Sequence, residues 1–136
     1  MRTQNRTAQT QRSNASSLHK KTFKVLRELY PNFTIQEETA LDVEAGGRPT
    51  KVFVDLIVKE LNLAIECHGR QHYEFTAHFH GTQTAFAQSQ QRDEAKRQAI
   101  LDARMSFLVI RFDEEAKLTP HWLITQITKA IKEIPE

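Results

Sequence analysis

The sequence predicts an α/β domain in which a mixed central β-sheet lies between helices in a three-layer arrangement. Three short runs, at residues 52–58, 63–67 and 107–112, are apolar at almost every position, as in strands that are covered on both faces. Segments with the periodicity of amphipathic helices precede, separate and follow these runs. A sheet buried on both sides needs helices on both faces, which gives three layers.

The chain has 136 residues, the size of one domain. We expect a flexible basic N-terminal arm at residues 1–15, where almost nothing is apolar, and a single domain at residues 16–136. No apolar run approaches the roughly 18 residues needed to span a bilayer, and the N-terminal segment does not resemble a secretory signal. The single cysteine, Cys67, gives no internal disulfide. We therefore expect a cytoplasmic protein without a membrane partner.

The first half of the chain predicts one helix and three strands. Ser16 and its polar neighbours Asn14 and Ser17 offer N-caps for a helix that ends at Pro31. A strand is expected at residues 33–41, followed by a turn at residues 46–49. The apolar runs at residues 52–58 and 63–67 then form two strands joined by a short turn.

The second half predicts a long loop, two helices and one strand. Residues 73–88 show no clear period and are expected to be a loop. Ser89 is the predicted cap of a helix that continues to Arg104, and the strand at residues 107–112 follows. Thr119 and Pro120 have the residue types of an N-cap and a first helical position. The expected apolar stripe of the last helix is Trp122, Ile124, Ile127 and Ile131.

Charge is distributed unevenly along the chain. The net charge is +2, but residues 1–27 contain basic side chains and no acid, so the remainder is net acidic. The basic residues of this segment are Arg2, Arg6, Arg12, Lys20, Lys21, Lys24 and Arg27. A basic segment on a mildly acidic body indicates a polyanion partner, with a solvated tail as the alternative.

Two acids interrupt the apolar strands. A tight hairpin that pairs Val58 with Leu63 also places Asp55 directly opposite Glu66, and directly opposed residues share a face of the sheet. On that face alternation also places Phe53, Ala64 and His68.

Facing carboxylates inside a sheet repel each other, and burying them without a partner is costly. A divalent cation between Asp55 and Glu66 would explain the arrangement, and the backbone carbonyl of Cys67 could complete its shell. Oxygen ligands suit Mg²⁺ or Mn²⁺. Two alternatives remain open. One acid could pair with a buried base, or the register could slip by one residue and turn one acid to the other face.

Further polar residues follow where the second apolar strand ends. His68 and His72 could transfer protons near neutral pH, although histidines in loops are often only hydrated, and Gln71 could simply bond to backbone. In the helix predicted from Ser89, helical spacing places Asp93 and Lys96 at the start of the stripe that faces the sheet. Lys96 could reach the carboxylate pair and a phosphate, or its charged end could turn to solvent.

These residues resemble a known family. Asp55, followed after ten residues by Glu66-Cys67-His68-Gly69-Arg70-Gln71-His72-Tyr73, is similar to the PD-(D/E)XK nuclease superfamily. The likeness is to the small phage and homing endonuclease branch, which is similar to the very short patch repair endonucleases. The helix with Asp93 and Lys96, and the strand at residues 107–112, also look like that branch. The resemblance covers about residues 16–115.

The resemblance implies a restriction-endonuclease-like core and hydrolysis of DNA phosphodiesters by metal-activated water. It implies Mg²⁺, or Mn²⁺, at Asp55, Glu66 and the carbonyl of Cys67, with Gln71 and His72 at the scissile phosphate. It also implies a bacterial or phage-infected host cell. The sequence departs from the pattern in three places. His68 stands where a lysine or aspartate is usual, Val54 replaces a proline, and Lys20 and Lys21 stand where the branch often has a first-helix glutamate.

These departures leave several roles open. Glu38 is a candidate third acid, and His68, His72 and Lys96 are candidates to replace the motif lysine. The residues expected to contact DNA are Arg12, Lys20, Lys21, Lys24, Arg70 and Arg92. The first hypothesis is a magnesium-dependent endonuclease, which could act as a homodimer. The alternatives are a nuclease-fold DNA-binding module with weakened or lost catalysis and a non-enzymatic, phage-type interaction protein.

Overall fold

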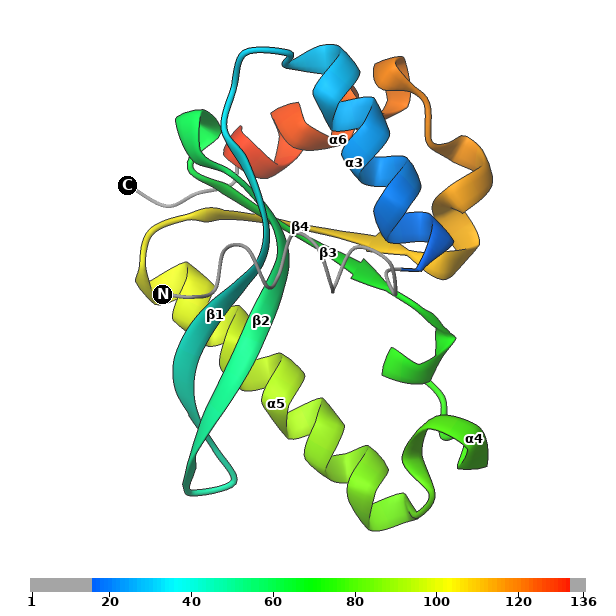
Figure 1. Ribbon diagram of the computed structural model, residues 1–136. Coiled ribbons are helices and arrows are strands. Elements are labelled where there is room, and N and C mark those ends of the chain that lie inside the picture. Colours follow the sequence, from blue (N-terminus) through cyan, green and yellow to red (C-terminus); the bar gives the residue numbers. More distant parts are fainter. Residues whose placement is uncertain (1–15, 133–136) are drawn as a thin grey trace.

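The computed structural model describes residues 16–132, so the predicted arm at residues 1–15 and the last four residues lie outside the described part. Within this part the chain forms an α/β domain with a mixed four-stranded sheet and helices on both faces (Figure 1). The predicted class and layering are therefore confirmed.

The sheet contains four strands in the order β1-β2-β3-β4. Their bounds are β1 Ile35–Ala45, β2 Arg48–Val58, β3 Leu63–His68 and β4 Ser106–Arg111. The first three strands are antiparallel neighbours, and β4 runs parallel to β3. All residues of β3 from Leu63 to Cys67 are buried, as expected for a strand with neighbours on both sides and a core on each face.

Helices cover the two faces of the sheet unequally. Helices α3 (Ser17–Leu29) and α6 (Pro120–Lys132) share one apolar core with β3, β4 and the last part of β2. Helix α5 (Gln83–Asp102) packs on the opposite face, where Ile100 contacts a core that includes Val54 and Ala64. Figure 1 shows α3 and α6 above β3 and β4 and α5 below them. A short helix, α4 (Ala77–His80), precedes α5.

The predicted N-caps of the first and last helices are confirmed. The Ser16 hydroxyl accepts a hydrogen bond from the His19 backbone N–H and caps α3. The Thr119 hydroxyl accepts from the Trp122 N–H ahead of α6. Gly46 and Gly47 both have positive φ, at 62° and 77°. They form a two-residue hairpin turn, so β2 starts before residue 52, the predicted start.

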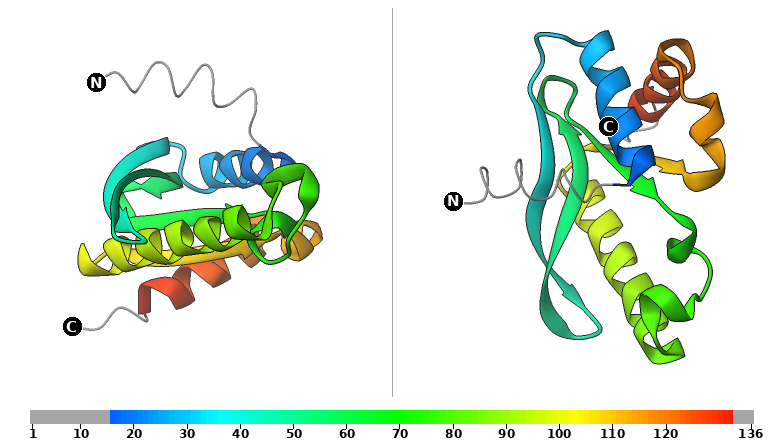
Figure 2. Two further views of the ribbon diagram at one scale, coloured as in Figure 1. Left: turned by 90° about the horizontal axis from the view of Figure 1, so that it is seen from below. Right: turned by 45° about the vertical axis from the view of Figure 1, so that its right-hand side comes forward.

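Helix α5 begins earlier than predicted. It starts at Gln83 and is capped by Thr82, whose hydroxyl accepts from the Ala85 N–H. Ser89, the predicted cap, lies inside the helix and donates to the Phe86 carbonyl. The loop prediction for residues 73–88 was therefore wrong at Ala77–His80, which form α4, and from Gln83 onward. The first turns of α5 lie beside α4 and away from β3 and β4 (Figure 2). None of residues 83–90 is buried, so these turns carry no apolar stripe from which a helix could be recognised.

The apolar stripe of α6 is also different from the prediction. The buried residues are Leu123, Ile127 and Ala130, whereas Ile124 and Ile131 are exposed. Ile127 is common to both sets, and Trp122 of the predicted stripe is partly buried against the same core. The buried face is therefore rotated around the helix axis relative to the predicted one. Within residues 16–132, no helix combines the length and apolarity that crossing a membrane would require.

The sheet contains an irregular point that decides where the site lies. The β1–β2 register runs from Ile35↔Val58 to Ala45↔Arg48 but omits the pair Glu38 and Asp55. Glu38 has a positive φ of 54°, a conformation that costs energy for a residue other than glycine. Across this point the alternation of faces breaks, because Val54 packs on the α5 side and Leu56 on the α3 side.

The rotated stripe of α6 can be tested with two isoleucines on the same helix. Ile127→Ala should lower the free energy of unfolding by about 2–4 kcal/mol, because it leaves a cavity in the core. Ile124→Ala should change it by less than about 1 kcal/mol, because that side chain is exposed. Urea unfolding followed by circular dichroism measures both, and equal losses would contradict the observed burial.

Candidate functional site

The candidate site lies where β2 and β3 separate. Their ladder pairs Val58 with Leu63 and continues to Leu56 and Ile65, which confirms the predicted register over this stretch. The ladder then stops, one pair short of Asp55 and Glu66. There the Asp55 N–H donates to Glu66 Oε2 at 2.9 Å, and the Cys67 N–H donates to Asp55 Oδ2 at 2.8 Å. Each carboxylate therefore accepts a backbone bond from the opposite strand.

The two carboxylates are close together, but their other contacts lie on opposite sides of the sheet. Glu66 is bonded by Lys96 of α5, whereas Asp55 lies beside His19 of α3. The expectation that both acids share one regular face was wrong, because the strand is irregular at Asp55. His68, predicted on the face of Glu66, does lie beside it, with Nε2 3.6 Å from Glu66 Oε1.

On the α5 side, Glu66 already has a cationic partner. Lys96 Nζ donates to Glu66 Oε1 at 2.8 Å, and both side chains are almost fully buried. Burial acts to raise the pKa of Glu66, but the neighbouring His68, Lys96 and the Asp55 N–H outweigh it and hold the pKa below its ordinary value. The alternative in which one acid pairs with a buried base therefore describes Glu66.

A second set of contacts orders the two histidines. The rings of His68 and His72 stack at 4.1 Å. His68 Nδ1 is hydrogen-bonded to the Tyr73 hydroxyl, and His72 Nδ1 to Asp93 Oδ2 at 2.8 Å. Burial acts to raise the pKa of Asp93, but the hydrogen bond and charge of His72 outweigh burial, so the pKa lies below its ordinary value. Asp93 and Lys96, predicted to face the sheet, thus each contact a predicted site residue.

These side chains line a cavity of about 460 Å³ between α5 and the strands β3 and β4. Glu66, His68, His72, Asp93 and Lys96 all contribute to its wall, and Arg97 adds a further cation. The volume is within the range of small-ligand sites, about 300–1,000 Å³. Acids, bases and cations therefore meet in one open-sided cavity.

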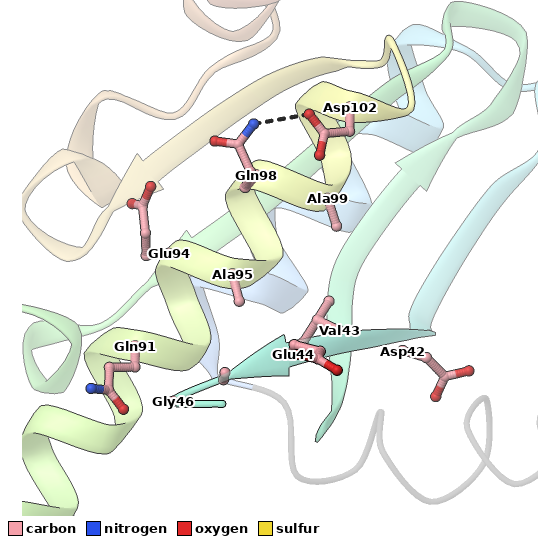
Figure 3. Close-up of a pocket in the computed structure, with 11 residues that line it drawn as sticks. Asp42, Val43, Glu44, Gly46, Gln91, Glu94, Ala95, Gln98, Ala99 and Asp102 are labelled. Carbon is pink, nitrogen blue, oxygen red and sulfur yellow. Dashed lines mark hydrogen bonds between the residues drawn. The ribbon is translucent and has the colours of Figure 1, made fainter. Parts of the chain in front are cut away.

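A larger hollow of about 540 Å³, between the end of β1 and α5, provides a contrast (Figure 3). Its wall carries Asp42, Glu44, Glu94 and Asp102, and the described residues that line it include no lysine, arginine or histidine. Such a surface repels a phosphate group. The cavity at Glu66, whose wall includes Lys96 and Arg97, is the better candidate for an anionic ligand.

On the α3 side, Asp55 lies in a compact acidic cluster. One ligand atom each from His19, Glu38 and Asp55 lies within 4.8 Å of the others. Burial and the nearby Glu66 charge raise the pKa of Asp55 from 3.8 to about 7. Burial, Glu66 and Glu37 likewise raise the pKa of Glu38. Unlike Glu66, Asp55 is therefore a poorly compensated acid, and its surroundings favour a cation.

His19 was missed by the sequence reasoning. It lies on the buried face of α3, and its Nε2 is 3.0 Å from Glu37 Oε1. Burial acts to lower the pKa of His19, but Glu37, Asp55 and Glu38 together raise it. Its position three residues before Thr22 and seven before Leu26, both buried, gives the helical spacing that could have identified it.

Other predicted residues lie apart from the cavity. The Gln71 amide folds over Gly69, and the Cys67 thiol is buried against Thr22. The predicted DNA contacts of the described part are exposed and do not line the cavity at Glu66. They are Lys20, Lys21, Lys24, Arg70 and Arg92. Arg70 packs over the Phe112 ring, and Arg92 lines a separate hollow at the β1–β2 turn together with Arg48. Arg12 lies outside the described residues.

Comparison with known proteins gives one partial likeness. The chain is 36% identical over 59 residues to uncharacterized protein 307L of Invertebrate iridescent virus 6, a match that spans 43% of this chain and 30% of the viral protein. A scan against protein-family profiles and a search of solved structures give no match. The likeness therefore covers a minor part of the viral protein and carries no activity with it.

The raised pKa of Asp55 predicts how stability depends on pH. Between about pH 4 and pH 7 Asp55 is deprotonated in the unfolded chain but still protonated in the folded protein. The folded state then binds more protons, so this residue lowers stability as pH rises through that window. Asp55→Asn, which cannot ionise and keeps an acceptor for Cys67, should be more stable than the parent protein by about 1–3 kcal/mol at pH 8.

Below pH 4 this difference should disappear, because both states of the parent are then protonated. Urea unfolding in EDTA from pH 4 to pH 8 measures it. Asp42→Asn is the matched control, since Asp42 is an exposed acid whose ion pair with Lys51 lies on the surface. An Asp55→Asn protein that loses stability relative to the parent as pH rises would contradict the pKa shift.

Proposed function

We propose that this protein is a metal-dependent endodeoxyribonuclease that hydrolyses DNA phosphodiester bonds with a restriction-endonuclease-like core. One observation carries the proposal. Glu38, Asp55 and Glu66 occupy corresponding positions on three adjacent strands, at the point where regular pairing fails. Such a row of acids beside a buried lysine is costly for stability alone, and strained, poorly compensated groups tend to cluster at functional sites.

The donor set fits a divalent ion of the Mg²⁺ or Mn²⁺ type. Asp55 and Glu66 supply carboxylate oxygens, and the resemblance adds the carbonyl of Cys67. The high pKa of Asp55 supports this fit. Lys96 lies directly against Glu66, whereas Asp55 has no cationic partner as close, so a bound cation would compensate its charge. A bound ion would supply an activated water and stabilise charge on the phosphate.

The chain's own residues have distinct roles in this proposal. Lys96, held against Glu66, presents a positive charge to a phosphate oxygen in the cavity. His72 is fixed through Nδ1 by Asp93, which leaves Nε2 to exchange a proton with the attacking or leaving oxygen. His68 is less suited to proton transfer, because both of its ring nitrogens already have partners in Tyr73 and Glu66.

In this proposal the protein would bind the phosphate groups of DNA and would not recognise its bases. The exposed lysines of α3 and the arginines Arg70 and Arg92 supply cations outside the cavity, and phosphate contacts of this kind position a duplex without reading its sequence. Arg97 supplies one cation on the cavity wall itself.

A second candidate function is DNA binding without catalysis. The observation that favours it is the ion pair of Lys96 with Glu66, since an acid that already has a buried cationic partner has less need of a metal ion. In that case the basic surface would remain functional while the cavity would not.

Cleavage of supercoiled plasmid separates the two functions. With Mg²⁺ or Mn²⁺ the parent protein should nick the plasmid, and EDTA should stop it. Asp55→Asn and Glu66→Gln should lose the activity, because each removes a charged oxygen ligand. His72→Gln should lower the rate by about 10²–10⁴-fold, as expected for loss of a proton-transfer group.

Asp42→Asn is the control for these variants and should cleave at the parent rate. Gel-shift binding at two salt concentrations, measured on the same proteins, reports DNA affinity separately from cleavage. Binding without nicking in either metal would favour the second function, and nicking that persists in Asp55→Asn would exclude the proposed site.

A further inference from the structure

The α3 side of the sheet carries a second set of ligand atoms, which shares only Asp55 with the pair Asp55 and Glu66. His19 comes from α3, Glu38 from β1 and Asp55 from β2. One ligand atom of each lies within 4.8 Å of the other two. A metal ion at the centre of such a group needs only small side-chain movements to reach bonds of about 2.0–2.2 Å.

Glu37 orients the histidine of this set. His19 Nε2 is hydrogen-bonded to Glu37 Oε1 at 3.0 Å, and Nδ1 lies on the Glu38 side, 3.8 Å from Glu38 Oε2. Histidines that bind metals usually donate their other ring N–H to a carboxylate or carbonyl, which fixes the tautomer and the ring. His19 therefore has the second partner that a metal-binding histidine requires, with Nδ1 as the ligand atom.

The backbone at Glu38 contributes to this geometry. Consecutive side chains of a regular strand point to opposite faces, yet Glu37 and Glu38 both lie beside His19. The positive φ of Glu38 accounts for the departure. The irregular residue thus places its carboxylate with Asp55 and His19, and the two glutamates contact different nitrogens of one ring.

We propose that His19 Nδ1, Glu38 and Asp55 bind a divalent transition-metal ion, of which Mn²⁺ is the test case, on the α3 side of the sheet. The imidazole nitrogen sets this site apart from an all-oxygen magnesium site, because nitrogen donors favour transition metals over Mg²⁺. The inference depends on the proposed nuclease function only through Asp55, which the two sites share. A metal at His19 can therefore exist whether or not DNA is cut.

Pulsed electron paramagnetic resonance of Mn²⁺ bound to the full chain tests the site directly. A directly bound imidazole nitrogen modulates the electron spin echo through its ¹⁴N nucleus, whereas oxygen ligands give no such modulation. The parent protein should show it. His19→Gln should abolish it, and His121→Gln, which removes an exposed histidine on α6, should leave it unchanged.

Two further measurements cover the case in which His19→Gln fails to fold. Glu38→Gln keeps the histidine, so it should retain the nitrogen signal while binding Mn²⁺ at least about tenfold more weakly, since it removes a charged ligand. Calorimetric titration of the parent should give tighter binding of Mn²⁺ than of Mg²⁺ by about tenfold or more. Equal affinities for the two ions would count against a nitrogen ligand.

The results separate this inference from the nuclease proposal. Mn²⁺-dependent plasmid nicking without ¹⁴N modulation would overturn the metal site at His19 and leave the nuclease proposal intact. His19 would then be a buried cation between Glu37 and Glu38. A nitrogen signal without nicking would establish the metal site and refute the nuclease. Loss of the signal in His121→Gln would also overturn the assignment to His19.

Discussion

The structure depends on two reciprocal hydrogen bonds between Asp55 of β2 and the backbone and side chain of β3. Where β2 and β3 separate, backbone N–H groups that would pair across a regular ladder are instead bonded to carboxylates. An unpaired buried N–H is costly, so the acids allow the strands to part without that penalty. The parting in turn gives Asp55 access to α3 and Glu66 access to α5.

The charges around this point are divided by the sheet. On the α5 side Lys96 compensates Glu66, and His72 pairs with Asp93. On the α3 side a single histidine lies beside Glu37 and Glu38, with Asp55 close by. The α5 side is therefore electrostatically close to balanced, whereas the α3 side has an excess of acid. A cation is expected where the imbalance lies, which is nearer to His19 than the sequence alone indicated.

Much of the fold could be predicted because it depends on local chemistry. The caps at Ser16 and Thr119 and the apolar run of β3 are properties of short segments, and the hairpin register followed from the spacing of Val58 and Leu63. The start of α5 and the buried face of α6 could not be predicted, because they depend on where the sheet ends and which side of a helix meets it.

The site was predicted in the same partial way. Asp55, Glu66, Asp93 and Lys96 were found from register and helical spacing, and the structure brings them within contact of one another or of the histidines. Helical spacing could have placed His19 on the buried face of α3, but not its role, which depends on the positive φ of Glu38 that turns two successive glutamates toward one ring. No pattern of residue types in a single sequence reveals such a backbone conformation in a residue other than glycine.

The early separation of β2 from β3 also has a consequence for self-association. From Arg48 to Asp55, β2 has β1 on one side and no other strand of the described chain on the other, so an open edge is available for a strand from a second molecule. Pro49 has no N–H to offer such a strand, and Arg48 and Lys51 are exposed charges on the same stretch. These are the devices by which sheet proteins resist edge-to-edge aggregation. The free part of β2 therefore combines an open edge with residues that disfavour the pairing of another strand along it.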